Sequence, residues 1–339
     1  MEYRSVPQVR LPVSRIIMGC ASDGFNGGKD QSALLDAALA AGINTIDTAR
    51  VYGQSERVIG QWLGKHRDEV VVVTKCAHPS PLDPMRLTEK EIRKDLETSL
   101  RELGTDRIDI YLFHRDHPSV EPGTMIEIMN ALKTEGKIDA FGASNWSYER
   151  FRQAQEYAEA HHLTPFSVSS PHYSLARQQA DPYGGGCVSL TGNENAAARR
   201  WYAETQTPVF AYSSLGRGLL SGKVKSGDAK NAASVLDTFA MKGYGCEDNF
   251  TRLARCEELA EKKGCSVAQI AMAWLYCQPL NTFAIVTMSS PTRIRENIAA
   301  LSLKLTEAEC RYLDLETEEL VSRNPYISDL GKNNHRWTI

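Results

Sequence analysis

The stretch QSALLDAALAAGINTIDT, residues 31–48, places a helix directly before a strand. Its apolar residues recur at helical spacing from Leu34 to Leu39, and Gly42 follows as a typical helix terminator. Residues 44–48 then form a short apolar run, which is typical of a strand buried on both faces of a parallel sheet. This unit predicts an alternating α/β architecture.

The same alternation runs through the whole chain. Short runs rich in Val, Ile, Leu, Phe or Tyr predict eight strands: Arg15–Cys20, Asn44–Thr48, Val70–Lys75, Ile108–His114, Ala140–Ser144, Phe166–Ser170, Val209–Tyr212 and Phe283–Thr287. Amphipathic segments predict helices over Gln31–Ala41, Ser55–Leu63, Thr88–Leu103, Met125–Lys133, Tyr148–His161, Asn195–Glu204, Arg252–Lys263, Thr292–Leu301 and, as an extra C-terminal helix, Thr306–Leu313. Eight β-then-α units predict a single-domain α/β chain with a closed (β/α)8 TIM barrel. The alternative, a doubly wound open sheet, lacks the G-x-G-x-x-G motif expected after its first strand.

The ends and the long connections complete this domain of residues 1–339. Residues 1–14 predict a small hairpin over one end of the barrel, formed by Val6–Val9 and Leu11–Val13, and residues 318–339 form a tail that is either disordered or packed on the barrel. Long βα loops at Tyr173–Asn193 and Gly216–Asp248 are expected on the face where the strands end, which is where such barrels build their binding sites.

Composition excludes several classes of protein. Of the 339 residues, 42% are hydrophobic and 24% are charged, which is typical of a globular protein and not of a disordered or fibrous one. The net charge of −3, without a basic run, argues against nucleic-acid binding. The eight cysteines lack zinc-site spacing, so we expect no metal site and a reducing, cytoplasmic location. The uncharged stretch 266–292 is broken by a turn signal at 278–281. Its first half, Val267–Tyr276, has helical spacing, its second half is a short apolar strand, and neither is long enough to span a membrane.

Ionisable side chains stand at the ends of three successive predicted strands. These residues are Asp47, Lys75 and His114, and Tyr52 follows Asp47 in the next loop. Taken singly, each has a simple explanation as a turn former or a surface residue. Together they predict a site in which an ammonium group lowers the pKa of a phenol, a carboxylate holds the ammonium group, and an imidazole orients a carbonyl oxygen. Such a site donates a proton to a carbonyl that receives a hydride, and a nicotinamide cofactor must supply that hydride.

These motifs resemble the aldo-keto reductase family. The resemblance extends from about residue 10 to residue 317. It rests on the segment GINTIDTARVYG at residues 42–53, on Lys75 at a strand end, and on His114 in the segment YLFH. It implies Tyr52 as the general acid, with Asp47, Lys75 and His114 completing a catalytic tetrad.

The resemblance also implies contacts to a nicotinamide cofactor. In GASN, Ser144 and Asn145 would hold the nicotinamide amide, and Ser170 stands where the family usually has a glutamine. The segment AYSSLGRGLL at 211–220 supplies the stacking Tyr212, and Ser213, Leu215 and Gly216, beside Gly218, would cradle the pyrophosphate through main-chain N–H groups. An adenosine clamp is implied at Ser289, Arg293, Glu296 and Asn297. Arg293 favours NADP(H), while NAD(H) remains an alternative.

We therefore predict an NADP(H)-dependent reductase of a small aldehyde or ketone, such as a sugar or another polar carbonyl compound, acting as a monomer or small homo-oligomer. Phe25, Trp146, Tyr173 and the two long loops are expected to line the substrate pocket. Two alternatives remain: a cofactor-sensing regulatory subunit with slow turnover, and a dehydratase or isomerase that uses Lys75 as a Schiff base.

Overall fold

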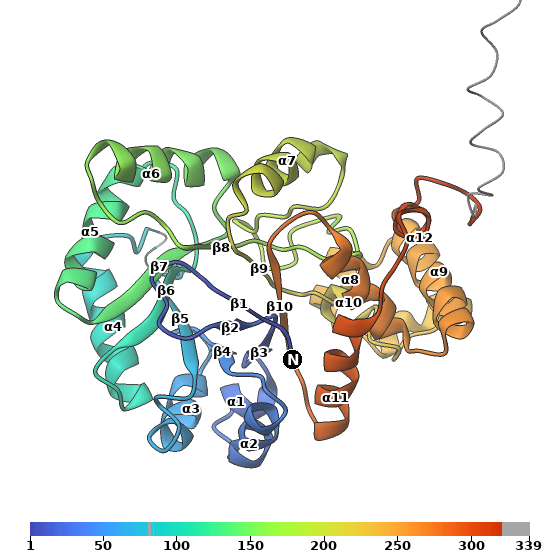
Figure 1. Cartoon of the computed structure of the whole chain (residues 1–339), viewed down its shortest axis with the longest axis horizontal. Coiled ribbons are helices and arrows are strands. Elements are labelled where there is room, and N and C mark those ends of the chain that lie inside the picture. Colours follow the sequence, from blue (N-terminus) through green and yellow to red (C-terminus); the bar gives the residue numbers. More distant parts are fainter. Residues whose placement is uncertain (81–82, 84, 321–339) are drawn as a thin grey trace, which may run out of the picture.

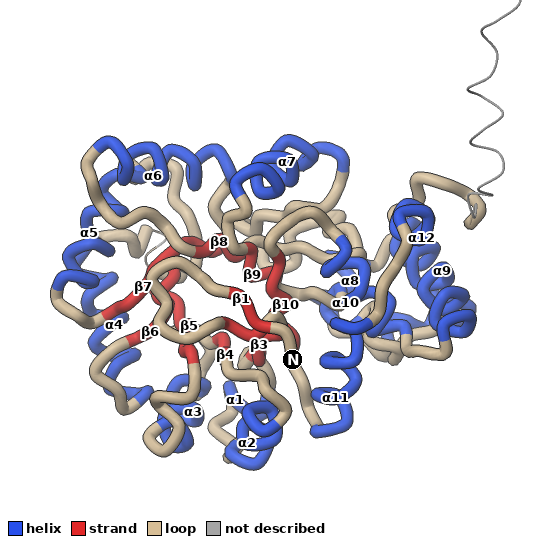
Figure 2. The backbone as a smooth tube through the Cα atoms, viewed as in Figure 1, coloured by secondary structure: helices blue, strands red, loops and turns tan. Residues whose placement is uncertain are grey.

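Eight parallel strands form a closed barrel in the order β10-β3-β4-β5-β6-β7-β8-β9, with helices around it (Figures 1 and 2). The computed structural model describes residues 1–80, 83 and 85–320. The barrel strands are β3 Ile16–Gly19, β4 Thr45–Asp47, β5 Val71–Cys76, β6 Ile108–Phe113, β7 Ile138–Ser144, β8 Val168–Ser170, β9 Val209–Ala211 and β10 Thr282–Val286. The predicted (β/α)8 barrel is confirmed, because every predicted strand is present at its expected place in the chain.

The larger helices follow the predicted amphipathic segments. They are α2 Ser32–Ala40, α3 Ser55–Leu63, α4 Glu89–Leu103, α5 Pro122–Thr134, α6 Tyr148–Ala160, α7 Ala196–Thr205, α9 Glu247–Lys263, α10 Val267–Cys277, α11 Pro291–Ala299 and the extra C-terminal helix α12 Glu307–Leu313. Two short helices, α1 Asp23–Asn26 and α8 Thr238–Tyr244, were not predicted.

Helices α5 and α9 begin earlier than the apolar pattern indicates. Helix α5 starts with Pro122 in its first turn, and α9 starts with the acidic residues Glu247 and Asp248. Proline and carboxylates suit the first turn of a helix, where amide groups are unpaired and the helix dipole is positive. The apolar periodicity does not predict the first turns of α5 and α9, because these turns add few residues to the apolar face of the helix.

The amino-terminal segment crosses one end of the barrel (Figure 1). Strand β1 Tyr3–Arg4 pairs antiparallel with β2 Val13–Ser14, whereas the sequence suggested pairing within the Val6–Val13 region. Proline lacks an N–H group, so Pro7 and Pro12 make that region a poor β ladder. Val6 and Val13 are instead buried against the apolar residues inside the barrel. This end is covered, and the opposite end, where the strands terminate, carries the candidate site.

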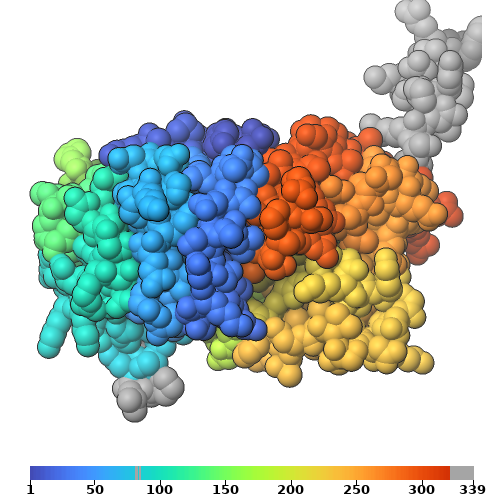
Figure 3. Space-filling view, turned by 90° about the horizontal axis from the view of Figure 1, so that it is seen from below, coloured from blue at the N-terminus to red at the C-terminus, as the bar shows by residue number. Residues whose placement is uncertain are grey.

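Barrel closure brings the two ends of the fold together. Strand β10 pairs with β3, and α11 packs beside α2, so the early and late parts of the chain share one surface in Figure 3. The predicted tail lies outside the described residues from residue 321 onward. In the part of the chain that the structure describes, no helix combines the length and apolarity needed to cross a bilayer.

The pairing of β7 with β8 depends on Gly142. A Cβ atom at this position would lie 2.0 Å from the Val168 carbonyl oxygen of β8. The two strands would have to separate, so we expect Gly142→Ala to lower the free energy of unfolding by at least about 2 kcal/mol. Urea unfolding measures this loss. Gly64→Ala is the control, because a Cβ there meets nothing within 4 Å, and an equal loss in both variants would contradict the explanation.

Candidate active site

Asp47 and Lys75 form a buried ion pair at the ends of β4 and β5. These strands are neighbours in the barrel, and Lys75 Nζ donates to Asp47 Oδ2 at 2.6 Å and to the Thr48 carbonyl oxygen at 2.8 Å. Burial alone would lower the pKa of Lys75, but the adjacent Asp47 carboxylate raises the pKa above its ordinary value. Lys75 therefore remains a cation, held in place by a counter-ion and a main-chain carbonyl.

Tyr52 and His114 lie beside this ion pair. Lys75 Nζ is 5.3 Å from the centroid of the Tyr52 ring, and the rings of Tyr52 and His114 meet edge to face with centroids 5.6 Å apart. Burial raises the pKa of Tyr52 even though the Lys75 charge acts against it. The lowered pKa expected from the sequence is thus wrong for the protein alone, because desolvation outweighs the ammonium group. The phenol remains protonated at neutral pH, which is the form a proton donor requires.

His114 is a neutral imidazole whose proton we assign to Nε2. Its side chain is buried, and Nδ1 has no hydrogen-bond partner among the described residues. Burial lowers the pKa of His114 well below its ordinary value, and the Lys75 charge lowers it further. A proton on Nδ1 would be a buried donor without an acceptor, so Nε2 is the better place for it. The alternative of His114 as a surface residue is wrong.

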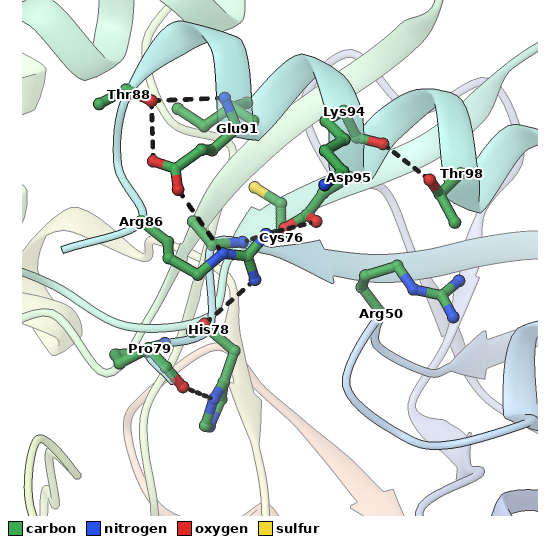
Figure 4. Close-up of polar contacts among 12 residues, drawn as sticks. Arg50, Cys76, His78, Pro79, Arg86, Thr88, Glu91, Lys94, Asp95 and Thr98 are labelled. Carbon is green, nitrogen blue, oxygen red and sulfur yellow. Dashed lines mark hydrogen bonds and ion pairs between the residues drawn. The ribbon is translucent and has the colours of Figure 1, made fainter. Parts of the chain in front are cut away.

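A second histidine, which the sequence analysis missed, packs on His114. The rings of His78 and His114 are 4.7 Å apart at 78°, and His78 Nδ1 lies 2.8 Å from the Pro79 carbonyl oxygen. Arg86 holds this loop, since it donates to Asp95 of α4 at 2.7 Å and to the His78 carbonyl oxygen at 3.3 Å (Figure 4). The available signal was its position three residues after Lys75, at the same strand end.

Four residues expected to contact the nicotinamide gather at the ends of β7, β8 and β9. Ser144 Oγ donates to the Ser170 carbonyl oxygen at 2.8 Å, and Ser170 Oγ donates to the Phe210 carbonyl oxygen at 2.9 Å. Asn145 Oδ1 accepts from the Tyr212 hydroxyl at 2.7 Å, and its Nδ2 donates to the His114 carbonyl oxygen at 3.1 Å. The structure brings these four residues together. Asn145 must, however, give up one of its present hydrogen bonds before its side chain can bind the nicotinamide amide.

The loop after β9 has a shape that differs in part from the expected phosphate cradle. Ser213, Gly216 and Gly218 all have positive φ, and a Cβ at Gly216 would lie 2.7 Å from Ala176 Cβ. The Gly216 amide donates to the Ser213 carbonyl oxygen, and the Gly218 amide donates to that of Leu215. Gly216 is therefore not a free amide donor as expected. Its role here is to close a tight turn that a larger residue would not fit.

The expected adenosine clamp lies at the start of α11, next after β10. Ser290 caps this helix, and Ser289 just before it is exposed. Arg293 Nη1 donates to Glu296 Oε2 at 2.7 Å, whereas Asn297 is buried. The arginine and the glutamate are thus partners of each other in the protein alone.

Comparison with known proteins assigns the chain to a family. A family model described as the aldo/keto reductase family matches residues 15–315. The chain belongs to the aldo-keto reductase family. The uncharacterized oxidoreductase YrpG of Bacillus subtilis (strain 168) is 30% identical over 331 residues, which is 93% of this chain and 95% of that protein.

Two further proteins resemble this aldo-keto reductase over nearly its whole length. The NADH-specific methylglyoxal reductase of Escherichia coli (strain K12) is 29% identical over 341 residues, covering 91% of this chain and 96% of that protein. The crystal structure of the thermostable aldo-keto reductase Tm1743, in complex with the inhibitor epalrestat, superposes with a TM-score of 0.69 and 23% identity, covering 94% of this chain and 100% of that one. The latter comparison supports the fold.

The three aromatic residues expected in the substrate pocket of this aldo-keto reductase lie elsewhere. Phe25, Trp146 and Tyr173 are buried in the hydrophobic core between barrel and helices. The rings of Trp146 and Phe113 are stacked with centroids 5.9 Å apart, and the centroids of the Tyr173 and Trp274 rings are 5.5 Å apart. The expectation was wrong because position after a strand end does not determine whether a side chain turns toward the barrel mouth or back toward the helices.

His172, in the loop after β8, is a buried histidine from which we expect a pH dependence of stability. Its ring nitrogens lie 2.9 Å from Ser189 Oγ and 3.1 Å from Ser174 Oγ, and burial lowers its pKa to about 3. Below about pH 6.5 the unfolded chain binds a proton at His172 that the native chain does not, so stability falls as pH falls from about 6.5 toward 3.

We expect the free energy of unfolding to be smaller at about pH 5 than at about pH 7.5, with roughly 2 kcal/mol of the difference due to His172. Urea unfolding at both pH values measures it. His172→Asn should lose that part of the difference, whereas His161→Asn, at an exposed position, should keep it. Equal pH dependence in all three proteins would exclude His172 as the source.

Proposed function

We propose that this chain is an NADP(H)-dependent reductase of small aldehydes or ketones, with Tyr52 as the general acid. The observation that carries the proposal is the buried Lys75–Asp47 pair, whose ammonium group lies 5.3 Å from the centroid of the Tyr52 ring, with the ring of neutral His114 edge to face with that of Tyr52. Membership of a family of carbonyl oxidoreductases supports the same chemistry.

The residues at the ends of β7 to β10 fit a dinucleotide cofactor. Arg293 is a partly exposed cation at the amino terminus of α11, where anions are favoured. Ser144, Asn145 and Tyr212 would hold the nicotinamide end. When bound, this cofactor supplies the hydride.

Each residue of the tetrad has a separate task. The Tyr52 hydroxyl donates its proton to the substrate oxygen as that oxygen gains negative charge, and Lys75 stabilises the phenolate that remains. Asp47 keeps Lys75 charged and in position. His114 Nε2–H donates a hydrogen bond to the carbonyl oxygen and orients it. Desolvation raises the strength of each of these interactions.

Turnover of NADPH with a panel of aldehydes and ketones tests the proposal. We expect a loss of the near-ultraviolet absorbance of NADPH with at least one class of carbonyl compound, and formation of the matching alcohol. If the purified protein binds NADPH but consumes none with any member of the panel, the proposal fails.

Arg293 is expected to determine the preference for NADPH over NADH. We expect Arg293→Ala to raise the KM for NADPH about tenfold or more, because a guanidinium–phosphate contact contributes roughly 1.5–3 kcal/mol, and to change the KM for NADH little. Steady-state kinetics with both cofactors measures the ratio. Since a relative is named as NADH-specific, the ratio is informative in either direction. Arg295→Ala, at an exposed neighbour on α11, is the control, and an equal change with both cofactors would refute the assignment.

A further inference from the structure

Arg115, the residue after His114, is a buried cation without a carboxylate partner. Its exposed fraction is 8%, and among the described residues no carboxylate oxygen lies within 4.0 Å of its guanidinium group. Within the described residues only Nη1 makes hydrogen bonds, at 3.3 Å to the Gly186 carbonyl oxygen and 3.2 Å to Cys187 Sγ. A buried charge is costly unless it is paired, so this guanidinium group lacks the partner that burial normally requires.

The carboxylates near Arg115 in the chain or in space are occupied. Asp116 accepts from Arg150 Nη2 at 3.0 Å. Asp181 accepts from the amides of Tyr183 and Cys187, at 2.7 Å in each case. These bonds hold both carboxylates beyond the 4.0 Å contact distance of an ion pair with Arg115, although Asp181 keeps its negative charge and the Arg115 charge helps to lower the pKa of Asp181.

Arg115 belongs to the same face of the barrel as the tetrad. Burial is the main cause that lowers the pKa values of His78 and His114, and the positive charge of Arg115 lowers both further. It also opposes the burial that raises the pKa of Tyr52. Nε and Nη2 of Arg115 make no hydrogen bond within the described part of the chain. They are also not among its buried polar atoms that lack a partner, so these two nitrogens are accessible to solvent or to a ligand.

Among the ionisable groups around the tetrad, Arg115 is a cation that contacts no carboxylate of the described residues. Lys75 is neutralised by Asp47, Tyr52 is protonated, and the two histidines are neutral at pH 7. We propose that Arg115 binds a carboxylate of the substrate, so that the chain reduces carbonyl compounds that also carry a carboxylate. This rests on the proposed reductase function and names the substrate class for it. A guanidinium group suits that role because its planar N–H groups match the two oxygens of a carboxylate.

Matched substrates test the proposal. The values of kcat/KM for 3- and 4-carboxybenzaldehyde are compared with those for their methyl esters, which keep the aldehyde but lack the charge. We expect the wild type to prefer the acids, and Arg115→Met to lower the acid-to-ester ratio on the order of 30-fold, or about 2 kcal/mol at 1.4 kcal/mol per tenfold. Arg115→Lys, which keeps the charge, should retain part of the preference.

Two controls separate this role from a structural one. Arg152→Met removes an exposed positive charge on α6 and should leave the ratio unchanged. The KM for NADPH should be the same in Arg115→Met as in the wild type, since a rise would assign the guanidinium group to the cofactor and overturn the proposal. An equal fall of kcat/KM for acids and esters in Arg115→Met would also overturn the proposal. A residue that only holds residues 186 and 187 in place would affect both kinds of substrate alike.

The failure of this inference and that of the reductase function look different. If the wild type reduces the esters as well as the acids, the reductase function stands and the carboxylate site is refuted. If it reduces none of them, calorimetric binding of 4-(hydroxymethyl)benzoate still decides the site. Binding that Arg115→Met weakens on the order of 30-fold supports a carboxylate site, and equal binding, or none to the wild type, refutes it.

Discussion

Tyr52→Phe is expected to lower kcat by about 10²–10⁴-fold, the range that a positioned general acid supplies. The substitution removes one oxygen atom and keeps the ring that contacts Lys75 and His114. Folding and NADPH binding should therefore be preserved, which thermal unfolding and cofactor fluorescence measure.

Tyr157→Phe on α6 is the matched control: it removes the hydroxyl of a partly buried residue, which donates to Glu127, and should leave kcat unchanged. A Tyr52→Phe variant that retains most of its kcat would exclude the phenol as proton donor. Loss of activity together with loss of NADPH binding would instead indicate a structural fault.

Lys75→Met is expected to have the largest effect on stability, because it leaves Asp47 as a buried carboxylate without its partner. Removing one member of a buried ion pair costs about 3–5 kcal/mol. Urea unfolding should show this loss, and kcat should fall because no ammonium group remains to stabilise the Tyr52 phenolate.

The double variant Asp47→Asn/Lys75→Met separates the two effects. It removes both charges, so we expect it to recover much of the lost stability while it stays inactive. Lys137→Met, which breaks an exposed pair with Glu97, should change stability little. If the double variant is no more stable than Lys75→Met, the unpaired Asp47 charge is not the cause of the loss.

The barrel could be predicted because each of its units is encoded locally. Apolar runs of strand length, helical periodicity and terminators such as Gly42 and Gly104 lie within a few residues of the elements they define. Where such signals were absent, prediction failed. The β1–β2 ribbon joins residues that lie nine and eleven positions apart around two prolines, and no periodicity marks its two-residue strands.

That Asp47, Tyr52, Lys75 and His114 lie together followed from the sequence, but the protonation state of the proposed tetrad did not. A strand end is a local property, and parallel neighbours bring Asp47, Lys75 and His114 to one face of the barrel. The pKa of Tyr52 depends instead on how much water the surrounding loops exclude, and here burial outweighs the charge of Lys75. Desolvation is a sum over atoms from the whole fold, which no single segment encodes.

By itself, the sequence determined the closed barrel, the family and the residues at the strand ends, because these depend on periodicity and short motifs. Only the tertiary structure decided that Trp146 turns back into the core, that Asn145 is bound by Tyr212, and that Arg115 is left with a carbonyl and a thiol from residues more than seventy positions away. The direction of a side chain and the balance of a buried charge depend on contacts between distant segments, and these exist only after the chain has folded.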